Sequence, residues 1–168
     1  MVRSRSSNVK GRRQPTDEFN VLFEAWRLSR AVSALLDAVL APSGLTADEF
    51  GVYSVLAGVA SITPTELARW MAAPATTVSS YVKRFESRGH VERAPNPEDL
   101  RSYRIQLTPA GRRVHRRAAD LFTPTLTRVL STLSDREADV RTAVRVLRDT
   151  VEAVHGADPA REQFPPRR

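Results

Sequence analysis

The sequence predicts a mainly helical fold with one small β-hairpin placed between two sets of helices. Three observations predict it. Apolar residues recur every three or four positions over most of residues 19–155, which is the period of an α-helix. Between Gly89 and Thr108 the period falls to two, the period of a half-buried strand. Several helix starts are marked by capping sequences. The 168 residues are enough for one compact domain or two very small ones.

Residues 19–41 are expected to form a long helix with two apolar faces. One row begins with Phe19, Leu22 and Trp26, and a second row follows the same spacing from Val21. Because a small monomer rarely covers a helix on two sides, we expect a partner subunit to cover one of them. The sequence from Pro42 to Gly44 should end the helix.

Three capping boxes mark the starts of later helices. Each has a hydroxyl residue followed three positions later by a glutamate, and they begin at Thr46, Thr63 and Ser134. The second box opens a short helix over residues 64–72. After a break at Ala73 and Pro74, a further helix is expected over residues 75–88, closed by Gly89.

Two short strands and two long helices complete the chain. Residues 90–93 and 103–107 alternate like strands, with a turn at residues 98–101. A helix from Pro109 to about Leu133 should be kinked by Pro124. The last helix, from Asp135 to about His155, carries a seam of Val140, Val144, Leu147 and Val151. That seam fits either a bundle face within one chain or a dimer interface, and with the two-faced first helix we favour a homodimer.

The charge is concentrated in two places. The net charge is +7, and residues 61–118 alone carry 11 basic and 5 acidic side chains. A basic arm at residues 1–18 and a tail at residues 156–168 are expected to be disordered. Such a charge distribution favours a polyanionic partner. We expect no membrane association, and a cytoplasmic location at the bacterial nucleoid.

Several function classes lack their required residues. The chain has no cysteine, and its three histidines do not have metal-ligand spacing. No glycine-rich phosphate loop and no paired carboxylates at a strand end occur. We therefore expect neither an enzyme nor a cofactor or metal site. His115 fits a satisfied packing position better than an effector ligand. The aromatic residues Phe23, Trp26, Phe50 and Tyr53 could line a pocket or simply form core.

The centre of the chain has the pattern of a helix-turn-helix followed by a β-hairpin wing. On the helix over residues 75–88, Val78, Tyr81, Val82 and Phe85 fall on one face. The opposite face is expected to enter the major groove of DNA. Its candidate DNA-contacting residues are Thr76, Thr77, Ser79, Ser80, Lys83 and Arg84. At the wing tip, Asp99 is positioned to hold the Arg101 guanidinium extended, so that it can enter the minor groove.

These residues resemble the MarR family of winged helix-turn-helix transcriptional regulators. The resemblance covers about Phe19 to Val154. It is most specific in the wing, at Val91-Glu92-Arg93, Pro97-Glu98-Asp99, Arg101 and Leu107-Thr108-Pro109-Ala110-Gly111. It implies a homodimer joined by the first and last two helices, binding a pseudo-palindromic operator. It also implies Arg101 in the minor groove, supported by Asp99, and a small aromatic or lipophilic effector, for which the sequence assigns no residues.

Two departures from the family pattern affect DNA recognition. Leu100 stands where members often carry a basic residue, and Ala75 and Ser80 stand where they usually have arginines. Contacts of Thr76 or Thr77 with thymine methyl groups, together with DNA shape, then become the expected means of readout. We predict a ligand-responsive repressor with a DNA-binding region at residues 46–108 and a dimerisation region at 19–45 and 109–155. A non-specific architectural DNA-binding protein is the alternative.

Overall fold

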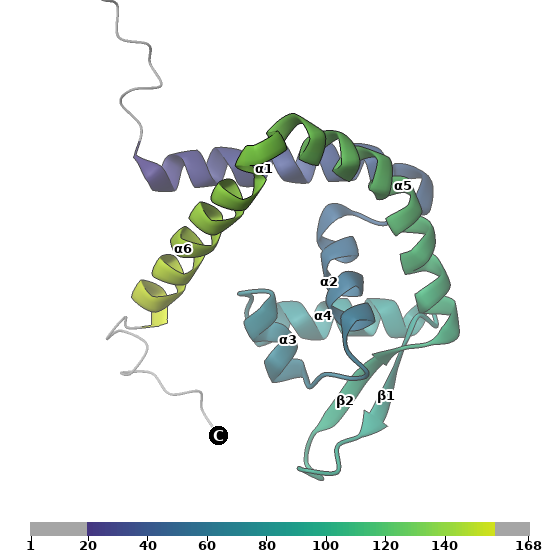
Figure 1. Cartoon of the computed structure of the whole chain (residues 1–168). Helices are drawn as coiled ribbons and strands as arrows, with labels where there is room; N and C mark the ends of the chain where they lie inside the picture. Colours follow the sequence, from purple (N-terminus) through teal and green to yellow (C-terminus); the bar gives the residue numbers. More distant parts are fainter. Residues whose placement is uncertain (1–19, 157–168) are drawn as a thin grey trace, which may run out of the picture. The chain divides into compact units, whose positions relative to one another are not determined.

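The computed structural model describes residues 20–156, and the chain divides into two compact units between Phe122 and Thr123. The basic arm, Phe19 and residues 157–168 lie outside the described residues. The structure is mainly helical with one antiparallel two-stranded hairpin, which confirms the predicted fold class (Figure 1). The elements are α1 (Val21–Leu40), η2 (Ala41–Ser43), α2 (Ala47–Gly58), α3 (Pro64–Trp70), α4 (Ala75–Ser87), β1 (Val91–Pro95), β2 (Tyr103–Leu107), α5 (Pro109–Leu133), η3 (Ser134–Arg136) and α6 (Glu137–Gly156).

Side-chain caps fix the starts of the first three α-helices. The Asn20 side chain accepts hydrogen bonds from the backbone N–H groups of Leu22 and Phe23, so α1 begins at Val21. The capping boxes predicted at Thr46 and Thr63 are both complete. Each hydroxyl accepts from the third helical N–H while the glutamate reaches back to the cap residue. These local bonds define where α2 and α3 begin.

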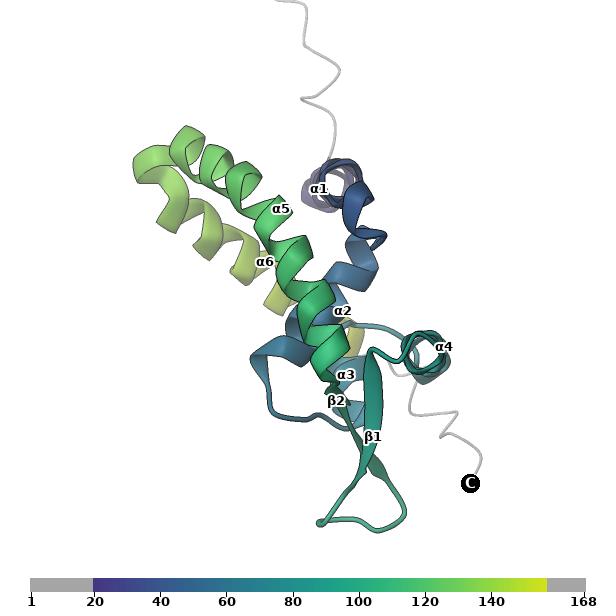
Figure 2. The same ribbon diagram turned by 90° about the vertical axis from the view of Figure 1, so that its right-hand side faces the viewer.

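The core of the first unit lies between α2, α3, α4 and the hairpin. The Tyr53 ring of α2 packs edge-on against Phe85 of α4, with centroids 4.6 Å apart. Figure 2 shows α4 end-on beside β1. The buried apolar residues of this core include Leu40, Leu45, Val52, Leu56, Ile62, Leu67, Val78, Val82, Val91, Ile105, Leu107 and Ala118. Because α4 buries only one face here, its other face is left exposed.

The hairpin pairs in one register and extends as a wing. Val91 faces Leu107 at its base and Pro95 faces Tyr103 near its tip. A bridge between Ile62 and Ile105 ties β2 to the segment before α3. The first strand thus begins and ends slightly later than the predicted residues 90–93. The second strand matches its prediction.

The second unit contains the end of α5 and the last helix. The α5 helix is continuous through Pro124. The capping box predicted at Ser134 is wrong, because Ser134 has φ 52° in a 3₁₀ turn and makes no cap hydrogen bond there. Glu137 instead pairs with Arg141. Gly156 belongs to α6 and not to the predicted tail.

Within the described residues, no single helix is long and apolar enough to cross a membrane. One pair of segments, Val21–Ser43 and Ala47–Gly58, passes that test together but is bent by 76° between them.

Candidate nucleic-acid interface

The exposed face of α4 carries the six side chains that the sequence predicted for it. Val78, Val82 and Phe85 are buried on the opposite face. The exposed residues are Thr76, Thr77, Ser79, Ser80, Lys83 and Arg84. The Ser80 hydroxyl donates to the Thr76 carbonyl over 3.0 Å, so its proton is already engaged. This surface presents short hydroxyl side chains that allow close approach of a ligand to the helix.

A buried carboxylate in α2 holds Arg84 of α4 and Arg88, the residue that follows the end of α4. Glu49 has a side chain 3% exposed, and its Oε1 lies 3.1 Å from Arg88 and 3.4 Å from Arg84. The Arg84 guanidinium also lies over the Tyr81 ring, 4.9 Å from its centroid. Arg84 is therefore engaged from two sides, although it lies at the predicted interface. Sequence reasoning assigned Glu49 only a capping role and missed this contact.

The wing is fixed to α4 by a second pair. Arg93 of β1 donates to both oxygens of Glu86, over 2.6 and 2.9 Å, and its guanidinium lies 4.3 Å from the Tyr103 ring centroid. A bidentate arginine–carboxylate pair fixes orientation as well as distance. From β2, Arg104 donates to the hydroxyl and carbonyl oxygens of Ser61. These contacts set the position of the wing relative to the exposed face of α4.

The wing tip is organised by a buried asparagine. Asn96 is 4% exposed, its amide donates to the Ser102 hydroxyl over 2.7 Å, and its Oδ1 accepts from the Glu98 N–H. The Asn96 carbonyl accepts from Asp99 N–H, and the Asp99 carbonyl accepts from Ser102 N–H. The tip is thus a hydrogen-bonded turn.

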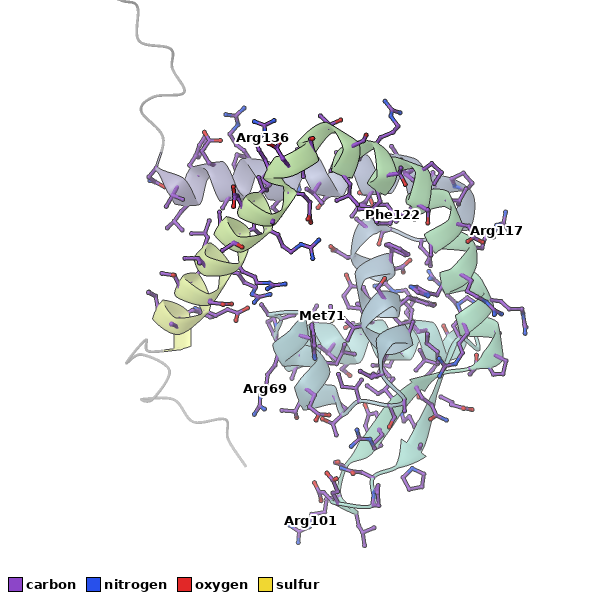
Figure 3. All side chains as sticks on the ribbon, in the orientation of Figure 1. Arg69, Met71, Arg101, Arg117, Phe122 and Arg136 are labelled. Carbon is purple, nitrogen blue, oxygen red and sulfur yellow. The ribbon has the colours of Figure 1, made fainter. Side chains whose placement is uncertain are left out.

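Asp99 acts on the main chain of the tip. Its Oδ1 accepts from the Arg101 backbone N–H over 3.0 Å. The predicted pairing of Asp99 with the Arg101 guanidinium is wrong, since the described residues contain no ion pair between them. The guanidinium is exposed, and Figure 3 shows Arg101 at the free end of the wing. Beside it, Leu100 is 90% exposed.

A tyrosine–histidine pair lies where α4 meets the wing. The Tyr53 hydroxyl lies 2.7 Å from His90 Nδ1. Burial raises the pKa of Tyr53 to about 12. Burial, and then the nearby positive charge of Arg88, lower the pKa of His90. The neutral forms of Tyr53 and His90 are therefore favoured.

A cavity of about 400 Å³ lies between α2, α3 and α4. Its lining includes the aromatic rings of Trp70 and Tyr81 and the carboxylate of Asp48, whose Oδ2 accepts from the Tyr81 hydroxyl over 3.4 Å. The remaining lining residues include Val52, Val55, Met71 and Thr77. Since Thr77 and Tyr81 belong to α4, a molecule bound here would contact that helix.

The aromatic residues considered from sequence do not line this cavity. Tyr53 is buried core, while Phe50 packs against Phe122 and against the ring of His115. The His115 Nε2 lies 3.2 Å from the Ser54 hydroxyl, so this histidine is a satisfied packing residue. Sequence reasoning did not identify Trp70 and Met71 as lining residues, although they lie near the break at Ala73 and Pro74.

The predicted dimerisation residues lie on two separate helices. On α1, Leu22 and Trp26 are 57% and 58% exposed. On α6, the exposed valines are Val140, Val144 and Val151, and Leu147 is partly buried. Within residues 20–156, no group of three or more histidine, aspartate or glutamate side chains is placed to hold a metal ion.

Comparison with known proteins gives consistent matches. A family model described as MarR family matches residues 43–102. The multiple antibiotic resistance protein MarR of Escherichia coli strain K12 is 33% identical over 100 residues, which make up 57% of this chain and 69% of that relative. The protein of the same name from Salmonella typhimurium is 32% identical over 100 residues, with the same coverage.

Solved structures match over a larger share of the chain. A Mycobacterium tuberculosis transcriptional regulator, MOSR, in complex with DNA has a TM-score of 0.71 and 26% identity, covering 81% of this chain and 98% of that one. A mutant Escherichia coli MarR complexed with operator DNA has a TM-score of 0.64 and 30% identity, covering 80% and 98%. The transcriptional repressor CouR bound to a DNA duplex has a TM-score of 0.66 and 26% identity, covering 79% and 92%.

Proposed function

This chain belongs to the MarR family of transcriptional regulators, and from that premise we propose that it binds double-stranded DNA as a sequence-specific, ligand-responsive repressor acting as a homodimer. The observation that carries the proposal is the pairing of an exposed hydroxyl-rich face on α4 with a wing fixed beside it. Relatives of similar fold are described in complex with DNA, which supports the same ligand for this chain.

The α4 face would lie in the major groove. Threonine methyl groups suit the methyl group of thymine, and serine hydroxyls can accept hydrogen bonds from base edges. Because Arg84 is engaged by Glu49, Lys83 is the cation of this face without an ion pair among the described residues. Recognition would then rest on close packing and DNA shape more than on charged contacts to guanine.

The wing would place Arg101 in the minor groove. Its guanidinium is exposed, and the turn that carries it is held by Asn96 and by the carboxylate of Asp99. A rigid turn lowers the entropy that must be lost when the arginine is inserted. The narrow minor groove of A·T-rich DNA has the most negative potential and so attracts arginine most strongly.

A second copy of this chain would cover the exposed apolar rows of α1 and α6. The rows on α1 contain Leu22, Trp26, Leu28 and Val32, all at least 45% exposed. On α6, Val144 is 49% exposed and Val140 is 41% exposed. Surfaces of this kind are uncommon on monomers and typical of subunit interfaces. A symmetric dimer would present two α4 helices to the two halves of a palindromic site at the nucleoid.

The cavity between α2, α3 and α4 would hold the effector. Its rings and aliphatic side chains suit a small aromatic or lipophilic molecule. The chain has two tryptophans, and only Trp70 lines the cavity. In a Trp26→Phe variant, binding of such a compound should change Trp70 emission and weaken DNA binding. A compound that changes the emission but leaves DNA affinity unaltered would contradict the effector role.

The function can be tested by selecting bound duplexes from a random pool at ~150 mM salt, where non-specific phosphate binding is weakened. We expect enrichment of a palindrome with half-sites about one helical turn apart. Binding without enrichment would instead favour a non-specific architectural protein. No binding to any duplex would refute the proposal.

Two substitutions test the wing and the dimer separately. Arg101→Ala should cost about 1–3 kcal/mol of affinity for the selected duplex and leave sedimentation unchanged. Leu147→Asp should separate the subunits, and because each monomer would then hold only one half-site, tight binding should be lost. A wild-type chain that sediments as a monomer and still binds the palindrome tightly would refute the homodimer.

A further inference from the structure

Four arginines lie on one face of the first half of α5. Arg112, Arg113, Arg116 and Arg117 are all exposed, and their spacing places them within a single stripe of the helix. No other six-residue stretch of the sequence holds four basic side chains. The first turn of α5 contains no acidic residue. We call these four residues the α5 arginine stripe.

The side chains of the stripe have no ion-pair partner in the described part of the chain. Asp120 stands three and four positions after Arg117 and Arg116, where a helical ion pair could form, but no such pair is present. Elsewhere in the same unit, Arg84, Arg88 and Arg93 are each engaged by a carboxylate. Cations near the start of a helix also oppose its dipole. Four unpaired arginines in this position suggest an external anion.

The stripe holds more free positive charge than the recognition helix. Arg84 of α4 and Arg88 at its C-terminal end are bound to Glu49, which leaves Lys83 as the cation of α4 without an ion pair among the described residues. Affinity for DNA that comes from counterion release depends on cations that reach phosphates. If α4 and the wing supplied all contacts to DNA, the largest group of arginines without an ion pair among residues 20–122 would take no part.

We propose that the α5 arginine stripe binds the phosphate backbone of a second DNA duplex while α4 and the wing hold the first. Residues four apart on a helix are spaced by about 6 Å, so Arg112 and Arg116, like Arg113 and Arg117, form two short rows of guanidinium groups. Each guanidinium can donate two parallel hydrogen bonds to a phosphate. This proposal rests on the DNA-binding function proposed above.

DNA fits the stripe better than an acidic protein does. Protein interfaces have an apolar centre. The larger apolar side chains of this part of α5, Val114, Leu121 and Phe122, are partly buried, and Val114 and Phe122 pack against the core. The stripe thus offers charge without an apolar centre, which is the character of a backbone-binding surface.

The side of α5 on which the stripe lies favours binding of a separate duplex over binding of a bent extension of the duplex held by α4 and the wing. Figure 3 shows Arg117 on the outer side of α5 and Arg101 at the free end of the wing. A duplex is stiff over about 150 base pairs, and turning it sharply costs several kcal/mol. A second duplex can reach the stripe without that cost.

A capture experiment tests the proposal with the full chain. The protein is saturated with a fluorescent short duplex carrying the selected palindrome, which occupies both recognition surfaces of a dimer. The complex is then passed over an immobilised duplex of unrelated sequence at about 100 mM salt. We expect the wild type to retain the fluorescent duplex. A variant with Arg112, Arg113, Arg116 and Arg117 all changed to Gln should retain at least tenfold less, with unchanged affinity for the palindrome.

A charge-matched control carries Gln in place of Arg128, Arg136, Arg145 and Arg148, four exposed arginines that lie outside the stripe. We expect this control to retain the fluorescent duplex as the wild type does, once sedimentation shows the same oligomer. Equal retention by the stripe variant and the control would overturn the proposal, as would no retention by the wild type.

A measurement on unrelated duplex alone separates this proposal from the proposed function. Each lost phosphate contact lowers the slope of log affinity against log salt by about 0.9, so the stripe variant should lose up to ~3.6 of slope. If the selection enriches no sequence but the slope still falls, sequence-specific regulation is refuted and the stripe is supported. If a palindrome is enriched and the slope is unchanged, only the stripe is refuted.

Discussion

We expect Glu49 to limit how much free charge α4 presents to DNA, and Glu49→Gln tests this. The glutamate is 3% exposed at its side chain and lies 3.1 and 3.4 Å from the guanidinium groups of Arg88 and Arg84. Glutamine retains an oxygen that can accept from the Thr46 N–H, so the cap of α2 survives. The substitution therefore removes the charge and little else.

The expected loss of stability is modest because the arginines are partly solvated. A hydrogen bond to a charged group contributes about 1.5–3 kcal/mol. Arg84 and Arg88 are 47% and 37% exposed, so water can replace part of what they lose. We expect unfolding to become about 1–2 kcal/mol easier, which for a chain of this size lowers Tm by about 2–8 °C.

Although Glu49→Gln should lower stability, it should raise affinity for DNA at low salt. Arginines released from Glu49 become free to contact phosphates, and each contact steepens the salt dependence by about 0.9 in the log–log slope. At 50 mM salt, Glu49→Gln should bind unrelated duplex more tightly than the wild type does. Between 50 and 200 mM salt, its affinity should fall about 3–4-fold further than that of the wild type for each freed arginine. The ratio of specific to non-specific affinity should decrease.

Glu66→Gln is the matched control. Glu66 is the capping-box glutamate of α3, with the same local geometry at Thr63, and it contacts no arginine of α4 among the described residues. Thermal melts and fluorescence anisotropy at several salt concentrations would compare the two variants. Identical Tm values and salt slopes for both would refute the idea that Glu49 restrains the arginines of α4.

Three further substitutions address the wing and its base. Asn96→Ala should leave the global fold intact but loosen the tip, costing about 1–2 kcal/mol of affinity for the selected duplex by anisotropy. Gly111→Ala should destabilise by several kcal/mol in urea melts, because the new Cβ would overlap the carbonyl oxygen of His90, although alanine normally favours a helix. The lowered pKa of His90 means that the unfolded chain is protonated first as pH falls through about 6.5. The free energy of unfolding should therefore be highest above that pH and decline below it. The decline should be less steep in His90→Gln.

Each of these has an outcome that would contradict it. Full DNA affinity in Asn96→Ala would mean that the tip does not need its hydrogen bonds. A stable Gly111→Ala protein would mean that α5 can move away from His90. The charged and titratable groups that face His90 are Tyr53, Arg88 and Glu49. His115 is a second histidine whose pKa is lowered by burial, so it could give the same dependence of stability on pH. An unchanged pH profile would assign the dependence to His115 instead.

Local signals allowed the first helix starts and the wing to be predicted from the sequence. A capping box joins residues three apart, so Thr46 and Thr63 could be identified without knowledge of the fold. The same pattern failed at Ser134 because the connection between α5 and α6 is a tight turn with this serine in the left-handed region. A hydroxyl in that conformation does not cap the following helix, and the sequence contains no sign of it.

Contacts between distant residues could not be predicted. Arg88 and Glu49 are 39 positions apart, and Arg104 and Ser61 are 43 apart. Their pairing depends on how α2, α4 and the wing pack. The role of Asp99 was misjudged for a related reason, since the pattern of an aspartate two residues before an arginine does not tell whether the carboxylate binds the side chain or the main chain.

These pairings explain how a strongly basic chain can have a recognition helix with little free charge. A buried carboxylate binds Arg84 of α4 and Arg88 at the end of that helix, so Lys83 is the cation of α4 that remains without an ion pair among the described residues. A helix bearing free arginines would bind every phosphate backbone similarly, which raises affinity without selectivity. With these arginines restrained, the hydroxyl groups of α4 would contact base edges and Arg101 would enter the minor groove, while the α5 arginine stripe would hold the backbone of a second duplex. If that division is correct, changes to the stripe will reduce capture of a second duplex without changing affinity for the palindrome, and changes to Glu49 will alter which DNA is preferred.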